Sequence, residues 1–163
     1  MSPLWTYFWP VFAFALALGL VGGVFGYRRK RRWIWAITVV LAIGGAAAWH
    51  GPLGGGDRFA GAVEASARQT LVDYEMTQVT AHLHRAPLTR RLMLSGQADD
   101  FQRSELVRIL SDLPGVSSAT WSSSGGMPLL LQAGIVSIAG LLAGLLIAYL
   151  IELRRRYNAQ WKW

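Results

Sequence analysis

The chain has 163 residues, 53% of them hydrophobic, and its 16 Lys and Arg against nine Asp and Glu give a formal net charge of +7. This length allows one small domain beside a few membrane spans, and the absence of cysteine excludes a disulfide framework. Nine of the basic residues lie within 28–32 and 154–162, each at the end of a long uncharged stretch. The charge therefore indicates a membrane topology, and we expect no nucleic-acid partner.

Three apolar stretches are predicted to be transmembrane helices, over 4–27, 33–50 and 129–151. A helix needs about 20 apolar residues to cross the hydrocarbon core, so each stretch is long enough. None of the three contains Asp, Glu, Lys or Arg. Transporters and proton relays use ionisable groups inside the membrane, so this composition argues against both.

Two basic clusters set the predicted orientation, because Lys and Arg accumulate on the cytoplasmic side of membrane helices. The clusters are a loop of Arg28, Arg29, Lys30, Arg31 and Arg32, and Arg154, Arg155 and Arg156 in a basic, aromatic tail over 152–163. The N-terminus and 51–127 then lie outside, in the periplasm of a bacterial inner membrane. Positive charge follows the first apolar stretch, the reverse of a signal peptide, so we expect this span to be retained. The same side chains can attract anionic membrane lipids.

Regularly spaced glycines in the first and third spans are predicted to mediate helix packing. They are Gly19, Gly22, Gly23, Gly26, Gly140 and Gly144. A missing side chain lets helix backbones approach closely inside a membrane. The pattern leaves two alternatives open, packing among the three spans or packing against a larger membrane protein.

The segment 57–121 is predicted to form one small α+β domain. Helical spacing of apolar residues predicts a helix over 57–73 and a second one capped by Asp99 or Asp100. Alternating residues predict strands over 78–84 and 91–97, and 116–121 supplies a third, so the order is αββαβ. A flexible linker is expected at 122–128. The residues expected to be buried are Phe59, Val63, Ala67, Leu71 and Tyr74 in the first helix, and Phe101, Leu106, Ile109, Leu110 and Leu113 in the second.

Two short motifs in this domain resemble the BON family of bacterial periplasmic modules. They are Leu94-Ser95-Gly96-Gln97-Ala98 after a strand, and Leu113-Pro114-Gly115-Val116-Ser117-Ser118-Ala119 at the end of the second helix. The resemblance covers about 57–121 and none of the spans. It implies binding rather than catalysis, with phospholipid, cell-wall material or protein as the partner. The family motif contains no catalytic residue.

The three histidines are the candidate ligands for a metal or a cofactor. His82 and His84 lie two apart on a predicted strand and therefore on one face, but Zn²⁺ needs three or four ligands and no third is evident. Ala46-x-x-x-His50 resembles the pigment-binding helix of light-harvesting polypeptides, which makes His50 a candidate ligand for pigment or haem. Gly51-Pro52 follows His50 directly, which places it near the membrane interface. We expect no metal site and no bound cofactor.

The predicted architecture is a membrane protein of three transmembrane helices with a small extracytoplasmic α+β domain. No phosphate-binding loop, nucleophile elbow or zinc-protease motif occurs, so the sequence predicts no enzyme. The leading hypothesis is a non-catalytic accessory or scaffold subunit of a larger inner-membrane complex, such as a respiratory or photosynthetic one. The alternatives are an envelope-binding protein that contacts phospholipid or cell-wall material, and a pigment- or haem-carrying polypeptide that uses His50.

Overall fold

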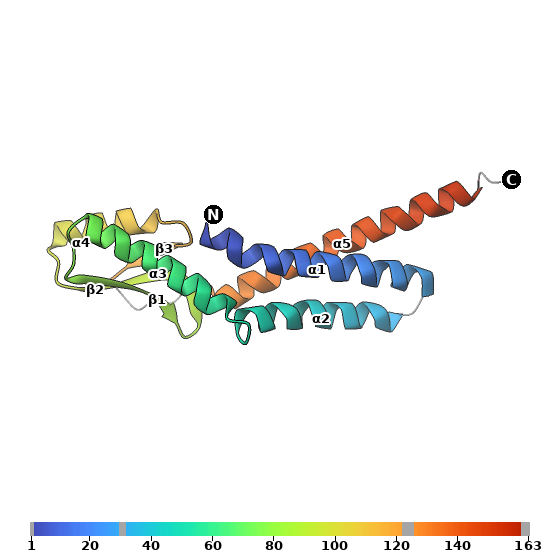
Figure 1. Ribbon diagram of the computed structural model, residues 1–163, viewed down its shortest axis with the longest axis horizontal. Coiled ribbons are helices and arrows are strands. Elements are labelled where there is room, and N and C mark those ends of the chain that lie inside the picture. Colours follow the sequence, from blue (N-terminus) through green and yellow to red (C-terminus); the bar gives the residue numbers. More distant parts are fainter. Residues whose placement is uncertain (1, 30–31, 122–125, 161–163) are drawn as a thin grey trace. The chain divides into compact units, whose positions relative to one another are not determined.

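The computed structural model describes residues 2–29, 32–121 and 126–160 and divides into two compact units (Figure 1). One unit holds Met1–Tyr7 with Leu53–Gln132, and the other holds Phe8–Pro52 with Ala133–Trp163. The elements in chain order are α1 (Pro3–Arg29), α2 (Arg32–His50), α3 (Gly55–Asp73), β1 (Val79–Arg85), β2 (Leu88–Gly96), α4 (Asp100–Ser111), β3 (Ser118–Thr120) and α5 (Leu129–Gln160). We call residues 55–121 the α/β domain.

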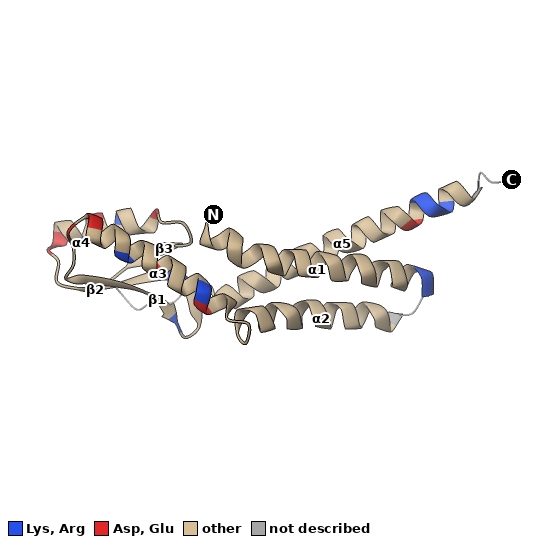
Figure 2. Cartoon of the chain, viewed as in Figure 1, with Lys and Arg blue, Asp and Glu red and all other residues tan. Residues whose placement is uncertain are grey.

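Helices α1, α2 and α5 are long and apolar enough to cross a membrane, as the sequence predicts. Helix α5 continues nine residues beyond Ile151, so most of the predicted tail 152–163 extends the third span as helix. Leu and Arg favour helix, and Arg156 Nε lies 3.2 Å from Glu152 Oε1 in an i,i+4 pair that supports the extra turns. Basic residues follow the apolar parts of α1 and α5 (Figure 2). Residues 30–31 of the predicted basic loop lie outside the described residues, and Arg32 begins α2.

The α/β domain has the predicted αββαβ order. Its sheet runs β1-β2-β3, with β1 and β2 antiparallel and β2 and β3 parallel. Helix α4 provides the connection that two parallel strands require. Leu92 at the centre of β2 pairs with Leu83 on one side and Ala119 on the other. The apolar face of the sheet is thereby built from all three strands.

Helix α3 buries four of its five predicted core residues, and α4 buries a narrower stripe than predicted. Phe59, Val63, Ala67 and Leu71 are buried on α3, as are Leu106 and Leu110 on α4, while Ile109 and Leu113 are half-buried. Tyr74 is 53% exposed because α3 ends at Asp73 and Tyr74 caps it. Phe101 is 75% exposed because it lies five residues before Leu106, about 140° away around the helix. The predicted burial of Tyr74 and Phe101 is therefore wrong.

Asp99 caps α4, which decides between the two predicted caps. Its carboxylate accepts the backbone N–H of Gln102 at 2.7 Å, and the Gln102 side chain accepts the Asp99 N–H at 3.1 Å. This reciprocal capping box satisfies two N–H groups that the first turn would leave without partners. The domain thus starts its second helix from a local signal in the sequence.

The boundaries of all three predicted strands shift, and β1 runs over Val79–Arg85 instead of 78–84. Strand β2 begins at Leu88 rather than residue 91, because Leu88 pairs with Arg85 of β1. Thr89 of β2 is buried and forms an isolated bridge to Pro128. Strand β3 is shorter than the predicted 116–121. Residues 122–125 of the predicted linker lie outside the described residues. Pro128, the last residue assigned to the linker, is held by its bridge to β2.

Candidate functional site

Four of the six predicted packing glycines lie where α1 meets α5. A Cβ added to Gly140 would lie 2.6 Å from the Phe12 carbonyl oxygen, and one added to Gly23 would lie 2.5 Å from the Ala148 Cβ. Added Cβ atoms on Gly19 and Gly144 would collide with the backbone carbonyls of Leu141 and Leu16. Because backbone cannot rotate away as a side chain can, this contact requires glycine.

The other two predicted packing glycines lie where α1 meets α2. An added Cβ on Gly22 would collide with the side chain of Thr38, and one on Gly26 would lie 2.9 Å from the Trp35 ring. The structure thus uses all six glycines for contacts within the chain. By contrast, Gly44 and Gly134 have no such neighbour within 4 Å.

A buried hydrogen bond joins α5 to α2, and the sequence analysis missed it. Ser137 is fully buried, and its hydroxyl donates to the Ala42 carbonyl oxygen at 3.0 Å. Thr38 is also buried, but its hydroxyl donates to Ile34 in its own helix at 2.8 Å. A serine inside an apolar span is the sequence signal that could have predicted this bond, since serine side chains in membrane helices often hydrogen-bond to a neighbouring helix.

An aromatic cluster marks the basic end of the spans. The Tyr27 ring at the end of α1 lies 5.1 Å from the Trp35 ring and 5.9 Å from the Tyr149 ring, measured between centroids. Tyr and Trp favour the headgroup level of a bilayer because their rings are apolar with one polar edge. We name Tyr27, Trp35 and Tyr149 the boundary cluster. Arg28 and Arg29 directly follow it on α1.

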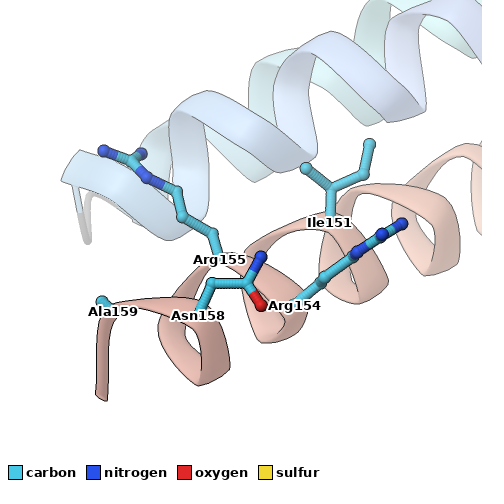
Figure 3. A pocket seen from close by; sticks show the side chains of 5 residues that line it. All are labelled: Ile151, Arg154, Arg155, Asn158 and Ala159. Atoms are coloured by element: carbon cyan, nitrogen blue, oxygen red, sulfur yellow. The ribbon is translucent and has the colours of Figure 1, made fainter. Parts of the chain in front are cut away.

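The last turns of α5 carry an open cavity of about 430 Å³ (Figure 3). It is lined by Ile151, Arg154, Arg155, Asn158 and Ala159, which cover a broad side of the helix because each lies three or four residues from at least one other. The remaining arginine of the predicted cluster, Arg156, pairs with Glu152. We call this cavity the α5 groove.

The histidines do not assemble a metal site in the part of the chain that the structure describes. His82 is exposed and His84 half-buried on the polar face of β1, as predicted, and His84 Nδ1 lies 3.0 Å from the Pro87 carbonyl oxygen. No group of three or more His, Asp or Glu side chains gathers among residues 2–29, 32–121 and 126–160. His50 is the last residue of α2 and half-buried, and its role as a pigment or haem ligand stays a prediction.

A second cavity lies along β1, which is an outer strand of the sheet. Its volume is about 270 Å³. It is lined by Arg68, Leu71, Val72, Met76, Thr77, Val79, Thr80, Ala81 and His82, from the end of α3, the following turn and the strand edge. The walls are mainly apolar, with Arg68 and His82 as the basic members. We call this cavity the edge groove.

Glu64 closes the neighbouring part of this strand edge. One carboxylate oxygen accepts the backbone N–H of Leu83 at 3.0 Å, and the other lies 2.8 Å from the Arg85 guanidinium. Backbone groups alternate in direction along a strand, so the N–H of Ala81 points toward the same edge, beside the edge groove that it lines. The strand edge is therefore covered by Glu64 at Leu83, and at Ala81, a residue that is 8% exposed, it borders the edge groove.

Arg90 holds the start of α5 against the α/β domain. Its guanidinium donates to the Gly115 carbonyl oxygen at 3.0 Å and to the Gln132 side chain at 3.4 Å. Partial burial lowers the pKa of this guanidinium, which still remains charged at neutral pH. Arg90 therefore acts as a structural clamp between β2, the turn after α4 and α5.

Comparison with known proteins gives no match, so a functional assignment depends on the geometry of the spans and the two grooves. No protein-family model matches the chain, and neither a curated protein nor a solved structure matches it. The edge groove offers strand backbone and apolar walls, and the α5 groove offers two guanidinium groups.

Proposed function

We propose that this protein is a non-catalytic accessory subunit that scaffolds a larger bacterial inner-membrane complex and binds it through the edge groove of the α/β domain. The groove is the observation that carries the proposal. Val72 is half exposed at its wall, beside Leu71 and Met76, and the groove runs along β1, an outer strand of the sheet. Apolar pockets next to a strand edge suit an extended protein segment, which can bond to the strand and insert its side chains.

The spans serve as the anchor in this proposal. The spans pack on one another through their glycines and through the hydrogen bond between Ser137 and Ala42. Helix α2 nevertheless presents an uncovered apolar side, with Val40 68% exposed and open space at Gly44. Lipid or a membrane-embedded partner protein can cover such a surface. In the proposed complex, a membrane-embedded partner protein covers it.

The orientation is proposed from charge. The basic residues beside the boundary cluster are placed in the cytoplasm, and the α/β domain is placed in the periplasm. Reporter fusions test this: a fusion after Trp121 should read as external and a C-terminal fusion as cytoplasmic. The opposite pair of readings would reverse the assignment.

The accessory role is tested by purification of the full chain in a gentle detergent, followed by mass spectrometry of whatever accompanies it. A stoichiometric membrane-protein partner is expected. Val72→Asp places a charge in the edge groove and should lower recovery of the partner about tenfold, which corresponds to ~1.4 kcal/mol of binding free energy. Ala65→Asp adds the same charge two turns earlier on α3, outside the groove, and should keep the partner. A chain that purifies alone, or equal recovery with both variants, contradicts the proposal.

The resemblance of two sequence motifs to the BON family suggests a second candidate, direct binding of envelope lipid or cell-wall material by the α/β domain. Both motif glycines have positive φ, 132° at Gly96 and 107° at Gly115. An added Cβ would collide with the Gln78 carbonyl at Gly96 and would lie 2.8 Å from Val63 at Gly115. The glycines of the two motifs are thus required by backbone geometry here. Binding of the detergent-solubilised full chain to isolated cell wall, in the absence of protein partners, would favour this candidate.

A further inference from the structure

We propose that the α5 groove binds the phosphate headgroup of an anionic phospholipid. The guanidinium groups of Arg154 and Arg155 hold the phosphate, and the Asn158 amide bonds the glycerol or phosphate oxygens beside it. The site stands apart from the accessory role, because the described residues that line it all belong to α5 and not to the α/β domain. It would serve the protein in a lipid bilayer with or without a protein partner.

The depth of the groove agrees with the headgroup layer. Tyr149 belongs to the boundary cluster, whose rings favour the region between acyl chains and headgroups. Arg154 follows five residues later, about 7.5 Å farther along the helix. Arginine at this height reaches lipid phosphates while Ile151, on the same face, still borders the acyl region.

The charges of the groove are available for a ligand. Within residues 2–29, 32–121 and 126–160, the acidic partner in this region is Glu152, and it is paired with Arg156. That leaves Arg154 and Arg155 as two cations at an exposed cavity, and their guanidinium groups extend to opposite sides of it (Figure 3). Guanidinium groups bind phosphate through paired N–H donors, which gives both charge and directional complementarity.

The chemistry of the lining favours a lipid over free phosphate. Ile151 and Ala159 add apolar surface beside the two arginines, and the exposed side chains of Ile147 and Leu150 lie one turn before Ile151 and Arg154 on the same side of the helix. A headgroup that is attached to acyl chains can use both kinds of surface. An inorganic ion would use the arginines alone.

The test titrates the full chain in neutral detergent with phosphatidylglycerol, or with phosphatidylcholine as the zwitterionic probe, and counts bound lipid by native mass spectrometry. Phosphatidylglycerol should bind more tightly, and R154Q/R155Q should weaken it about tenfold. The matched control, R28Q/R29Q, removes two charges after the boundary cluster but outside the groove and should change binding less than about threefold. Asn158→Asp provides a second variant, since it puts a carboxylate in the groove and leaves both arginines in place.

Inorganic phosphate in large excess separates the two phosphate sources. Phosphatidylglycerol should stay bound if the site takes a lipid, and full displacement by inorganic phosphate would overturn the lipid assignment. Equal weakening by R154Q/R155Q and R28Q/R29Q would show diffuse attraction and would overturn the site. If thermal unfolding shows that R154Q/R155Q does not fold, Asn158→Asp decides instead. Unchanged phosphatidylglycerol binding by Asn158→Asp would then overturn the proposed site.

Discussion

The carboxylate of Glu64 on α3 accepts the backbone N–H of Leu83 on β1 at 3.0 Å. This contact gives an outer strand a side-chain partner where a neighbouring strand would otherwise bond. Exposed strand edges are prone to unwanted pairing, and covering them is a common protection. Here the protection is local, because it stops before Ala81 and leaves the edge groove accessible.

Glu64→Ala should lower the free energy of unfolding of the α/β domain by about 1–3 kcal/mol, because Leu83 loses its hydrogen-bond partner. Arg85→Ala should cost less than ~1 kcal/mol, since the Arg85 side chain is 55% exposed and such ion pairs contribute little. Hydrogen exchange at the Leu83 amide, measured on the full chain, should accelerate in the first variant and much less in the second.

The matched control for Glu64 is Glu105→Ala, which breaks an exposed pair with Arg108 within α4. It should change stability by less than ~0.5 kcal/mol. If Glu64→Ala and Glu105→Ala destabilise the protein equally, the bond to Leu83 has no special role.

Gly144→Ala should destabilise the packing of α1 against α5, because the new methyl group meets the Leu16 carbonyl and lies 2.7 Å from the Leu20 nitrogen. Overpacking of this kind costs about 1–3 kcal/mol. Gly134→Ala, on the same helix and with no such neighbour within 4 Å, should be neutral or slightly stabilising. Thermal unfolding in detergent compares the two, and a lower midpoint for Gly134→Ala than for Gly144→Ala would contradict this contact.

Ser137→Ala should weaken the contact between α5 and α2 by about 0.6 kcal/mol, the average for hydrogen bonds between membrane helices. Thr38→Val is the control, because it removes a hydroxyl that bonds within its own helix and keeps the shape that Gly22 contacts. The unfolding midpoint should fall more for Ser137→Ala. A larger effect of Thr38→Val would show that the buried hydroxyls act locally.

Several elements could be predicted because their signals are local. The capping box at Asp99 needs only a residue three positions away, and the buried residues of α3 follow from helical spacing. The predictions of burial and of element ends failed where the local sequence pattern differs from the packing in the folded chain. Phe101 is apolar, but it lies about 140° around α4 from Leu106 and therefore faces solvent. Helix α5 extended past its apolar part because charged residues also favour helix.

The sequence by itself determined three apolar helices, the αββαβ order and the positions of the basic clusters, since each depends on neighbouring residues. Only the tertiary structure decided the bonds from Glu64 to Leu83 and from Ser137 to Ala42, which join residues 19 and 95 apart in the chain. It also decided that the packing glycines meet partners in the same chain. Composition and periodicity report which face of an element is apolar. Which partner that face meets depends on folding, which brings distant segments into one small volume.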